Sequence, residues 1–193
     1  MNTVVAVVGS AVAYLVGTFP SAPLVARANG LDITRVGSGN PGASNIARVL
    51  GWRKGIWVFV LDAAKGAIAA GLGLLVDGRP LAYVLAGAAI VGHVFPIGRG
   101  FRGGKGVATG GGAFAVISPV VFPVLILIWL VVSRLTRMAA LASILAVAAL
   151  PVGVALVGRE PWEVPATIAL CGLVMIRHLG NIKRIVTRRE NRL

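Results

Sequence analysis

Apolar runs separated by short polar segments dominate the pattern along the chain. The runs cover approximately residues 3–26, 55–76, 81–98, 106–133, 138–157 and 163–177. A bilayer core of about 30 Å needs roughly 20 apolar residues per helix, and most of these runs approach or exceed that length. The pattern therefore predicts an all-α polytopic integral membrane protein, with residues 1–193 forming a single transmembrane domain. The first run lacks a basic flank and a small-residue cleavage motif, so we interpret it as a retained helix and not as a signal peptide.

The charges between the runs predict the orientation in the membrane. Three segments are rich in Lys and Arg, namely 27–54, 98–106 and the tail from Arg177. The segments 77–80 and 158–163 carry no excess of positive charge. Because Lys and Arg accumulate on the cytoplasmic side of membrane proteins, we expect the three basic segments in the cytoplasm and the other two outside.

The run 106–133 decides the number of crossings. As one span it would place Arg134, Arg137 and the basic tail outside, whereas two crossings keep every basic segment inside. Ser118-Pro119 and Pro123 lie near its middle, where a turn is favoured because proline cannot continue a helix from upstream. We therefore expect seven transmembrane helices, with the N-terminus outside and the C-terminus cytoplasmic. Six helices, or a re-entrant segment, is the alternative.

The composition agrees with a membrane protein. Hydrophobic residues make up 57% of the chain and charged residues 13%, with a mean hydropathy of +0.89. A soluble domain carries about 25% charged residues, so a cytosolic enzyme is excluded. The net charge is +13, and the Lys and Arg residues that produce it lie between the apolar runs. This placement favours roles in orienting the protein in the membrane and in binding an anionic ligand over a role in binding nucleic acid. Cys171 is the single cysteine, and no His, Cys, Asp or Glu cluster has metal-ligand spacing, so we expect no disulfide, metal or cofactor.

The first stretch with candidate chemistry covers residues 37–48 and reads GSGNPGASNIAR. Glycines let backbone N–H groups turn toward an anion, and Ser and Asn side chains add donors. Ser44 or Asn45 is expected to cap a short helix that carries Arg48, and a helix N-terminus favours phosphate. The alternative is a flexible loop. The candidate binding residues are Gly37, Ser38, Gly39, Asn40, Gly42, Ser44, Asn45 and Arg48.

The second stretch combines GHVFP at 92–96 with FRGGKGVAT at 101–109. Gly-Gly-Lys-Gly before an apolar helix predicts a phosphate cradle, in which backbone N–H groups hold the oxygens and Lys105 neutralises them. Gly106 stands where a P-loop needs Ser or Thr, so a P-loop ATPase is disfavoured. The alternative is an ordinary basic loop beside the membrane. The candidates are His93, Arg102, Gly103, Gly104, Lys105, Gly106 and Thr109.

The third stretch, RHLGNIKR at 177–184, follows the last apolar run. His178 and Asn181 are three residues apart and share a face if the helix continues. A positive-inside anchor explains Lys183 and the arginines, but not the histidine and the asparagine.

Two charged residues lie inside the second apolar run, where an isolated charge is costly. They are Asp62 and Lys65, again three residues apart. We interpret them as a structural ion pair.

In order, spacing and total length, the three stretches resemble the bacterial acyl-phosphate:glycerol-3-phosphate acyltransferases of the PlsY type. The resemblance covers essentially the whole chain, although Ser44 stands where the family usually has Thr. It implies seven transmembrane helices in the bacterial cell membrane, with the active site facing the cytoplasm. It also implies transfer of a long-chain acyl group from acyl phosphate to the 1-hydroxyl of glycerol 3-phosphate, which yields lysophosphatidic acid and inorganic phosphate for phospholipid biosynthesis.

The resemblance suggests roles for the candidate residues. Lys105 and the N–H groups around Gly103 to Gly106 would hold one phosphate. Ser38, Asn40 and Arg48 would bind the second phosphate or the glycerol. His178 and Asn181 would orient the hydroxyl, and either His178 or a substrate phosphate would take its proton. The expected catalytic residues are thus Ser38, Arg48, Lys105, His178 and Asn181, while Ser143 and Lys183 join the substrate-binding set.

A transporter or flippase for a phosphorylated metabolite or lipid is the competing interpretation. It would use the same basic loops, but it would also need polar residues on both sides of the membrane. The segments expected outside are short and carry few polar groups, which counts against this interpretation. The expected partners are glycerol 3-phosphate, long-chain acyl phosphate and membrane lipid. We expect neither nucleic acid nor an obligate protein partner.

Overall fold

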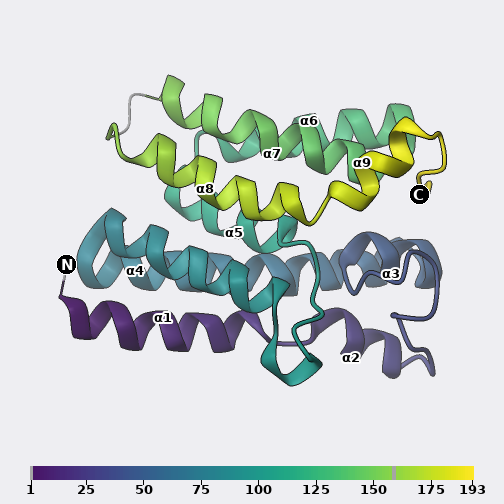
Figure 1. Cartoon of the computed structure of the whole chain (residues 1–193), viewed down its shortest axis with the longest axis horizontal. Helices are drawn as coiled ribbons and strands as arrows, with labels where there is room; N and C mark the ends of the chain where they lie inside the picture. The colour runs from purple at the N-terminus through teal and green to yellow at the C-terminus, as the bar shows by residue number, and fades with distance from the viewer. Residues whose placement is uncertain (1, 158–159) are drawn as a thin grey trace. The chain divides into compact units, whose positions relative to one another are not determined.

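The computed structural model describes residues 2–157 and 160–193, and over these residues it contains helices and connecting turns but no strand (Figure 1). The chain divides into two compact units, Met1–Ile117 and Ser118–Leu193. Each unit is described by itself below. The expectation of a single domain stays a prediction.

The first unit is built around one long helical element. Its helices are α1 (Thr3–Gly17), α2 (Ser21–Arg27), α3 (Ala43–Leu50), α4 (Trp52–Val94), the short 3₁₀ turn η1 (Ile97–Arg99) and α5 (Val107–Ile117). Helices α1, α3 and α5 all pack on α4. Figure 1 shows α1, in purple, running alongside α4.

Helix α4 is a hairpin of two helical legs. The backbone leaves helical geometry at Asp77 (φ −150°, ψ 25°) and Gly78 (φ 74°, ψ −159°). A Cβ atom on Gly73 would overlap the backbone of Ala82, although nine residues of straight helix would separate the two by about 13 Å. The chain therefore reverses at 77–78, which confirms the predicted boundary between the second and third apolar runs.

Glycines bring α5 into backbone contact with α4. A Cβ atom on Gly66 would overlap the carbonyl oxygen of Thr109, and one on Gly112 would overlap the carbonyl oxygen of Ala63. Small residues at facing positions let helices approach this closely. The first turns of α5 are thus fixed against the part of α4 that carries Asp62 and Lys65.

The second unit contains α6 (Phe122–Thr136), α7 (Ala139–Leu156), α8 (Glu163–Ile176) and α9 (Leu179–Val186). Helix α7 packs against both α6 and α8. The end of the chain folds back toward the segment between α6 and α7, where the amide of Leu193 donates to the carbonyl of Arg137 over 2.7 Å.

The fourth apolar run is broken where the prolines predict. Helix α5 ends at Ile117 and α6 begins at Phe122, with Pro123 in its first turn, where a missing N–H costs nothing. Helix α5 has 11 residues and spans only about 16 Å. The break confirms the predicted turn, while two separate crossings stay a prediction.

Three segments of the described chain are long and apolar enough to cross a membrane: Thr3–Arg27, Trp52–Arg99 and Ala139–Leu156. A fourth is added if α8 and α9, which are bent by 61°, count as one span. Large apolar side chains on the helices lie open, such as Leu75, which is 85% exposed, and Leu156, which is 81% exposed. Such exposure is expected where helices face lipid.

Candidate active site

The loop before α3 is organised by Asn45. Its side-chain oxygen accepts from the amide of Ser38 at 2.8 Å, and its Nδ2 donates to the carbonyls of Ile33 (3.3 Å) and Val36 (3.0 Å). The residue is 1% exposed. Asn45 therefore shapes the loop from inside, and its expected contact with substrate stays a prediction.

Arg48 also contacts Asn45. Its guanidinium Nη1 lies 3.4 Å from the oxygen of Asn45, and Arg48 is itself half-buried. One turn of α3 thus holds the amide that orders the loop and a cation beside it.

Two glycines of this loop have left-handed backbone geometry. Gly37 has φ +59° and Gly39 has φ +69°. A Cβ atom on Gly37 would also overlap the side-chain oxygen of Asn45. The glycines are therefore needed for the shape of the loop.

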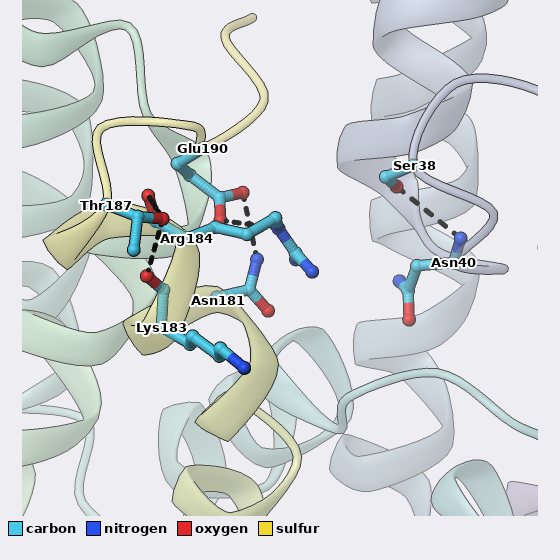
Figure 2. Close-up of polar contacts among 7 residues, drawn as sticks. All are labelled: Ser38, Asn40, Asn181, Lys183, Arg184, Thr187 and Glu190. Atoms are coloured by element: carbon cyan, nitrogen blue, oxygen red, sulfur yellow. Dashed lines mark hydrogen bonds and ion pairs between the residues drawn. The ribbon is translucent and has the colours of Figure 1, made fainter.

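The side chains of Ser38 and Asn40 lie on the outer part of the same loop (Figure 2). The amide of Asn40 donates to the hydroxyl of Ser38 at 3.4 Å. Ser38 is exposed, and Asn40 and Ser44 are half-buried. The N-cap of α3 is Gly42 and no side chain caps the helix, so the expected capping by Ser44 or Asn45 is wrong.

The loop between α4 and α5 closes back on the end of α4. The amide of Gly103 donates to the carbonyl of Val94 (3.0 Å), and that of Gly104 to the carbonyl of His93 (3.1 Å). These two amides are therefore bound to the protein, which corrects the expectation that they donate to a phosphate. Lys105 is half-buried directly after them and Arg102 is exposed.

Gly106 has φ +88° and α5 begins at the next residue. The N-terminus of α5, at Val107, therefore lies two residues after Lys105. A cation beside the positive end of a helix dipole is the arrangement expected for an anion-binding site.

Thr109 does not contribute to this exposed region. It is 0% exposed and lies in the contact between α5 and α4, and its expected role in substrate binding stays a prediction.

A buried ionic cluster lies behind the loop. Asp62 and Lys65 form the predicted ion pair, with 2.6 Å between Oδ1 and Nζ. His93 Nδ1 lies 3.7 Å from the same oxygen of Asp62, and the ring faces the Cα of Gly104. His93 is 6% exposed, and its expected contact with substrate stays a prediction.

In the second unit, His178 precedes α9. Its Nδ1 lies 2.8 Å from the carbonyl of Val174, and the residue is 1% exposed. A carbonyl can only accept, so Nδ1 carries a proton, and in the neutral ring Nε2 is the accepting nitrogen. The sequence expectation assumed that the preceding helix continues. Instead α8 ends at Ile176 and α9 begins at Leu179, with His178 at the bend.

Asn181 is held by an acidic residue that the sequence analysis missed. Its Nδ2 donates to Glu190 Oε1 at 2.9 Å, and Arg184 Nε donates to Glu190 Oε2 at 3.1 Å (Figure 2). The carboxylate side chain is 4% exposed. The available signal was one Glu within a tail rich in Arg, where it adds nothing to a positive-inside anchor.

The two remaining candidates differ in exposure. Lys183 is exposed on α9. Ser143 is 6% exposed, and its hydroxyl donates to the carbonyl of Ala139 (2.8 Å) and accepts from Trp129 Nε1 (3.0 Å). Ser143 therefore links α6 to α7, and its expected role as a binding group stays a prediction.

Among the described residues, no group of three or more His, Cys, Asp or Glu side chains is placed to hold a metal ion. The chemistry present is that of cations, amides and hydroxyls. Such groups suit phosphate-bearing substrates.

The fold and these loops define a class: all-helical integral membrane proteins with basic, glycine-rich loops suited to phosphates. Comparison with known proteins identifies the family. The family described as glycerol-3-phosphate acyltransferase matches residues 7–188. The chain belongs to this family of acyltransferases, which confirms the resemblance.

Individual relatives agree over nearly the full length. A glycerol-3-phosphate acyltransferase of Geobacter sulfurreducens is 41% identical over 187 residues, which are 95% of each chain. One from Bacillus velezensis is 38% identical over 183 residues, 94% of each chain.

Two solved structures of PlsY, an integral membrane glycerol 3-phosphate acyltransferase, have the same fold. The glycerol 3-phosphate form gives a TM-score of 0.93 and the lysophosphatidic acid form 0.91. Each is 35% identical, and the match covers 97% of this chain and 95% of the other. The predictions of an all-helical integral membrane protein and of a glycerol-3-phosphate acyltransferase are therefore confirmed.

Proposed function

We propose that this membrane acyltransferase uses acyl phosphate as its donor and acylates the 1-hydroxyl of glycerol 3-phosphate. The observation that carries the proposal is the likeness to PlsY structures in a glycerol 3-phosphate form and a lysophosphatidic acid form, which correspond to the acceptor and the product of this transfer. The PlsY-type resemblance of the sequence supplies the donor.

The reaction asks little covalent chemistry of the protein. The hydroxyl oxygen attacks the acyl carbonyl carbon, the bond from that carbon to the phosphate oxygen breaks, and the hydroxyl proton passes to a base. An acyl phosphate already has a good leaving group. The enzyme therefore mainly positions the two reactants and stabilises the charge of the departing phosphate.

The residues of the first unit suit the two phosphates. Lys105, at the start of α5, would neutralise one phosphate, and the helix N-terminus would add to the attraction. Ser38, Asn40 and Arg48 would bind the second phosphate or the glycerol. Gly37, Gly39 and Gly42 would give the loop its shape.

The residues of the second unit suit the hydroxyl. With Nδ1 bound to the carbonyl of Val174, His178 is oriented to accept a proton at Nε2. Asn181 would orient the hydroxyl, and its amide is held in place by Glu190. A phosphate of the substrate is the alternative proton acceptor.

The proposed topology has seven crossings. They are α1, the two legs of α4, and helices α5, α6, α7 and α8. The N-terminus lies outside and the basic loops and tail lie in the cytoplasm of a bacterial cell, as the positive-inside rule predicts. The acyl chain would lie between helices in membrane lipid, and no obligate protein partner is required.

The proposal is tested by phosphate release from palmitoyl phosphate by the purified protein in lipid, with and without glycerol 3-phosphate. We expect release that needs glycerol 3-phosphate and yields lysophosphatidic acid. Lys105→Ala is expected to lose about 2–3 kcal/mol of transition-state stabilisation, seen as a fall in kcat/KM of about 100-fold. Normal turnover by this variant would contradict the role of Lys105. No transfer by the folded wild-type protein would contradict the proposed function.

A further inference from the structure

Three buried ionisable residues of the first unit have no part in the chemistry proposed above. Asp62 is 2% exposed, Lys65 5% and His93 6%. Burying charges at this depth is costly, and replacing a buried ion pair by apolar groups is often neutral or stabilising. Such a pair is therefore weak evidence for a purely stabilising role, and the contacts of these residues point to another.

The contacts of these residues form a continuous chain that ends at the loop carrying Lys105. Lys65 Nζ donates to the carbonyl of Phe19 (2.6 Å) and to Asp62 Oδ1 (2.6 Å). Asp62 Oδ1 lies 3.7 Å from His93 Nδ1. The other side of the His93 ring is in contact with Gly104, where a Cβ atom would overlap Nε2. Gly104 immediately precedes Lys105.

The same loop is fixed to the protein on both sides of Lys105. Before it, the amides of Gly103 and Gly104 donate to the carbonyls of Val94 and His93. After it, α5 packs on Ala63 and Gly66, the neighbours of Asp62 and Lys65 in α4. The position of Lys105 therefore depends on His93 and on the turn of α4 that holds the ion pair.

We propose that Asp62, Lys65 and His93 are positioning residues that set the loop of Lys105, and hence the affinity for the phosphate that Lys105 holds. Asp62 lies against the Nδ1 side of the His93 ring, the ring contacts Gly104 on its other side, and Lys65 compensates the charge of Asp62 and donates to the carbonyl of Phe19. The kinetic part of this inference rests on the proposed function of Lys105, whereas the structural part does not.

The test uses the double variant Asp62→Asn/Lys65→Met in lipid nanodiscs. It removes the two charges of the ion pair together, so neither member of the pair is left buried without the other. Asp77→Asn is the matched control, because it makes the same change at the bend of α4, where the Asp77 carboxylate accepts from the amide of Asn2. The single variant Asp62→Asn is measured in the same experiments, for comparison with the double variant.

The first readout is amide hydrogen exchange of the segment 97–106, which requires no enzymatic activity. We expect exchange in the double variant to be about tenfold faster than in the wild type, because the hydrogen bonds of Gly103 and Gly104 open more often. Asp77→Asn is expected to leave this segment unchanged. Wild-type protection of the segment in the double variant would overturn the inference, whatever the protein catalyses.

The second readout separates positioning from a loss of folded enzyme. Lys105→Arg identifies the substrate whose KM depends on Lys105. We expect the double variant to raise the KM of that same substrate about three- to tenfold and to leave the KM of the other unchanged. A lower kcat with both KM values unchanged would indicate only fewer active molecules and would overturn the positioning role. Absence of acyl transfer in the wild type would contradict the proposed function and leave the exchange result to decide this inference.

Discussion

At the scale of single residues, the orientation of the His178 ring assigns a different role to each of its two nitrogens: one holds the ring in place and the other is the candidate base. Nδ1 is bound to the carbonyl of Val174, so a base would have to act through Nε2. Asparagine at this position can keep a donor near Nδ1 and has nothing in place of Nε2. We expect His178→Asn to lower kcat about 100-fold while the protein stays folded, as measured by phosphate release at saturating substrates. Near-wild-type kcat would show that a substrate phosphate takes the proton.

Asn45 gives a second prediction at this scale, because its two ends are not interchangeable. Nδ2 donates to two backbone carbonyls, of Ile33 and Val36. Asn45→Asp puts a second oxygen there, so the buried carbonyls lose their donor and face a like partial charge. We expect a loss of about 1–3 kcal/mol for each unsatisfied group, and weaker activity because Ser38 and Arg48 move with the loop. Thermal unfolding in detergent measures the change. An unchanged midpoint temperature of unfolding would contradict the role of Asn45 in holding the loop.

At the scale of helices, the approach of α5 to α4 depends on glycine at particular positions. A Cβ atom on Gly66 would overlap the carbonyl of Thr109, whereas one on Gly71, in the same leg, meets nothing within 4 Å. We expect Gly66→Ala to destabilise the protein by about 1–3 kcal/mol through overpacking. Gly71→Ala is expected to be neutral or to stabilise by about 0.5–1 kcal/mol, since alanine favours a helix. Equal unfolding midpoints for the two variants would contradict the close packing.

The sequence predicted those features of the elements that depend on local pattern. The turn at Asp77–Gly78, the break before Pro123 and the Asp62–Lys65 pair all follow from neighbouring residues or from a spacing of one helical turn. The capping of α3 was predicted wrongly, because Ser and Asn favour caps in general and here Gly42 takes that position.

Side-chain roles that depend on distant partners could not be predicted in this way. His93 meets Asp62 only because α4 reverses between them, and Glu190 meets Asn181 only because the tail folds back on α9. Asn45 and Ser143 are polar residues in or near polar stretches, a pattern that is equally typical of ligand contacts and of internal hydrogen bonds. Composition and spacing identify such residues as important without showing what they touch.

At the scale of the whole molecule, the number of crossings decides which face of the membrane each loop meets. Two crossings by α5 and α6 place residues 98 and 137 on the same side, and one crossing places them on opposite sides. The test introduces single cysteines, Gly98→Cys and Arg137→Cys, in a Cys171→Ala background. Both positions are exposed, and a Cβ atom on Gly98 meets nothing within 4 Å.

Labelling by a membrane-impermeant maleimide in right-side-out and inverted vesicles reads the side of each cysteine. We expect both to react in inverted vesicles only, because the surrounding Lys and Arg retain these loops in the cytoplasm. Glu160→Cys, in the segment before α8, is the control for the outer side and is expected to react in right-side-out vesicles. Reaction of Gly98→Cys and Arg137→Cys from opposite sides would mean that α5 and α6 make one crossing together, and the basic tail would then have to lie outside.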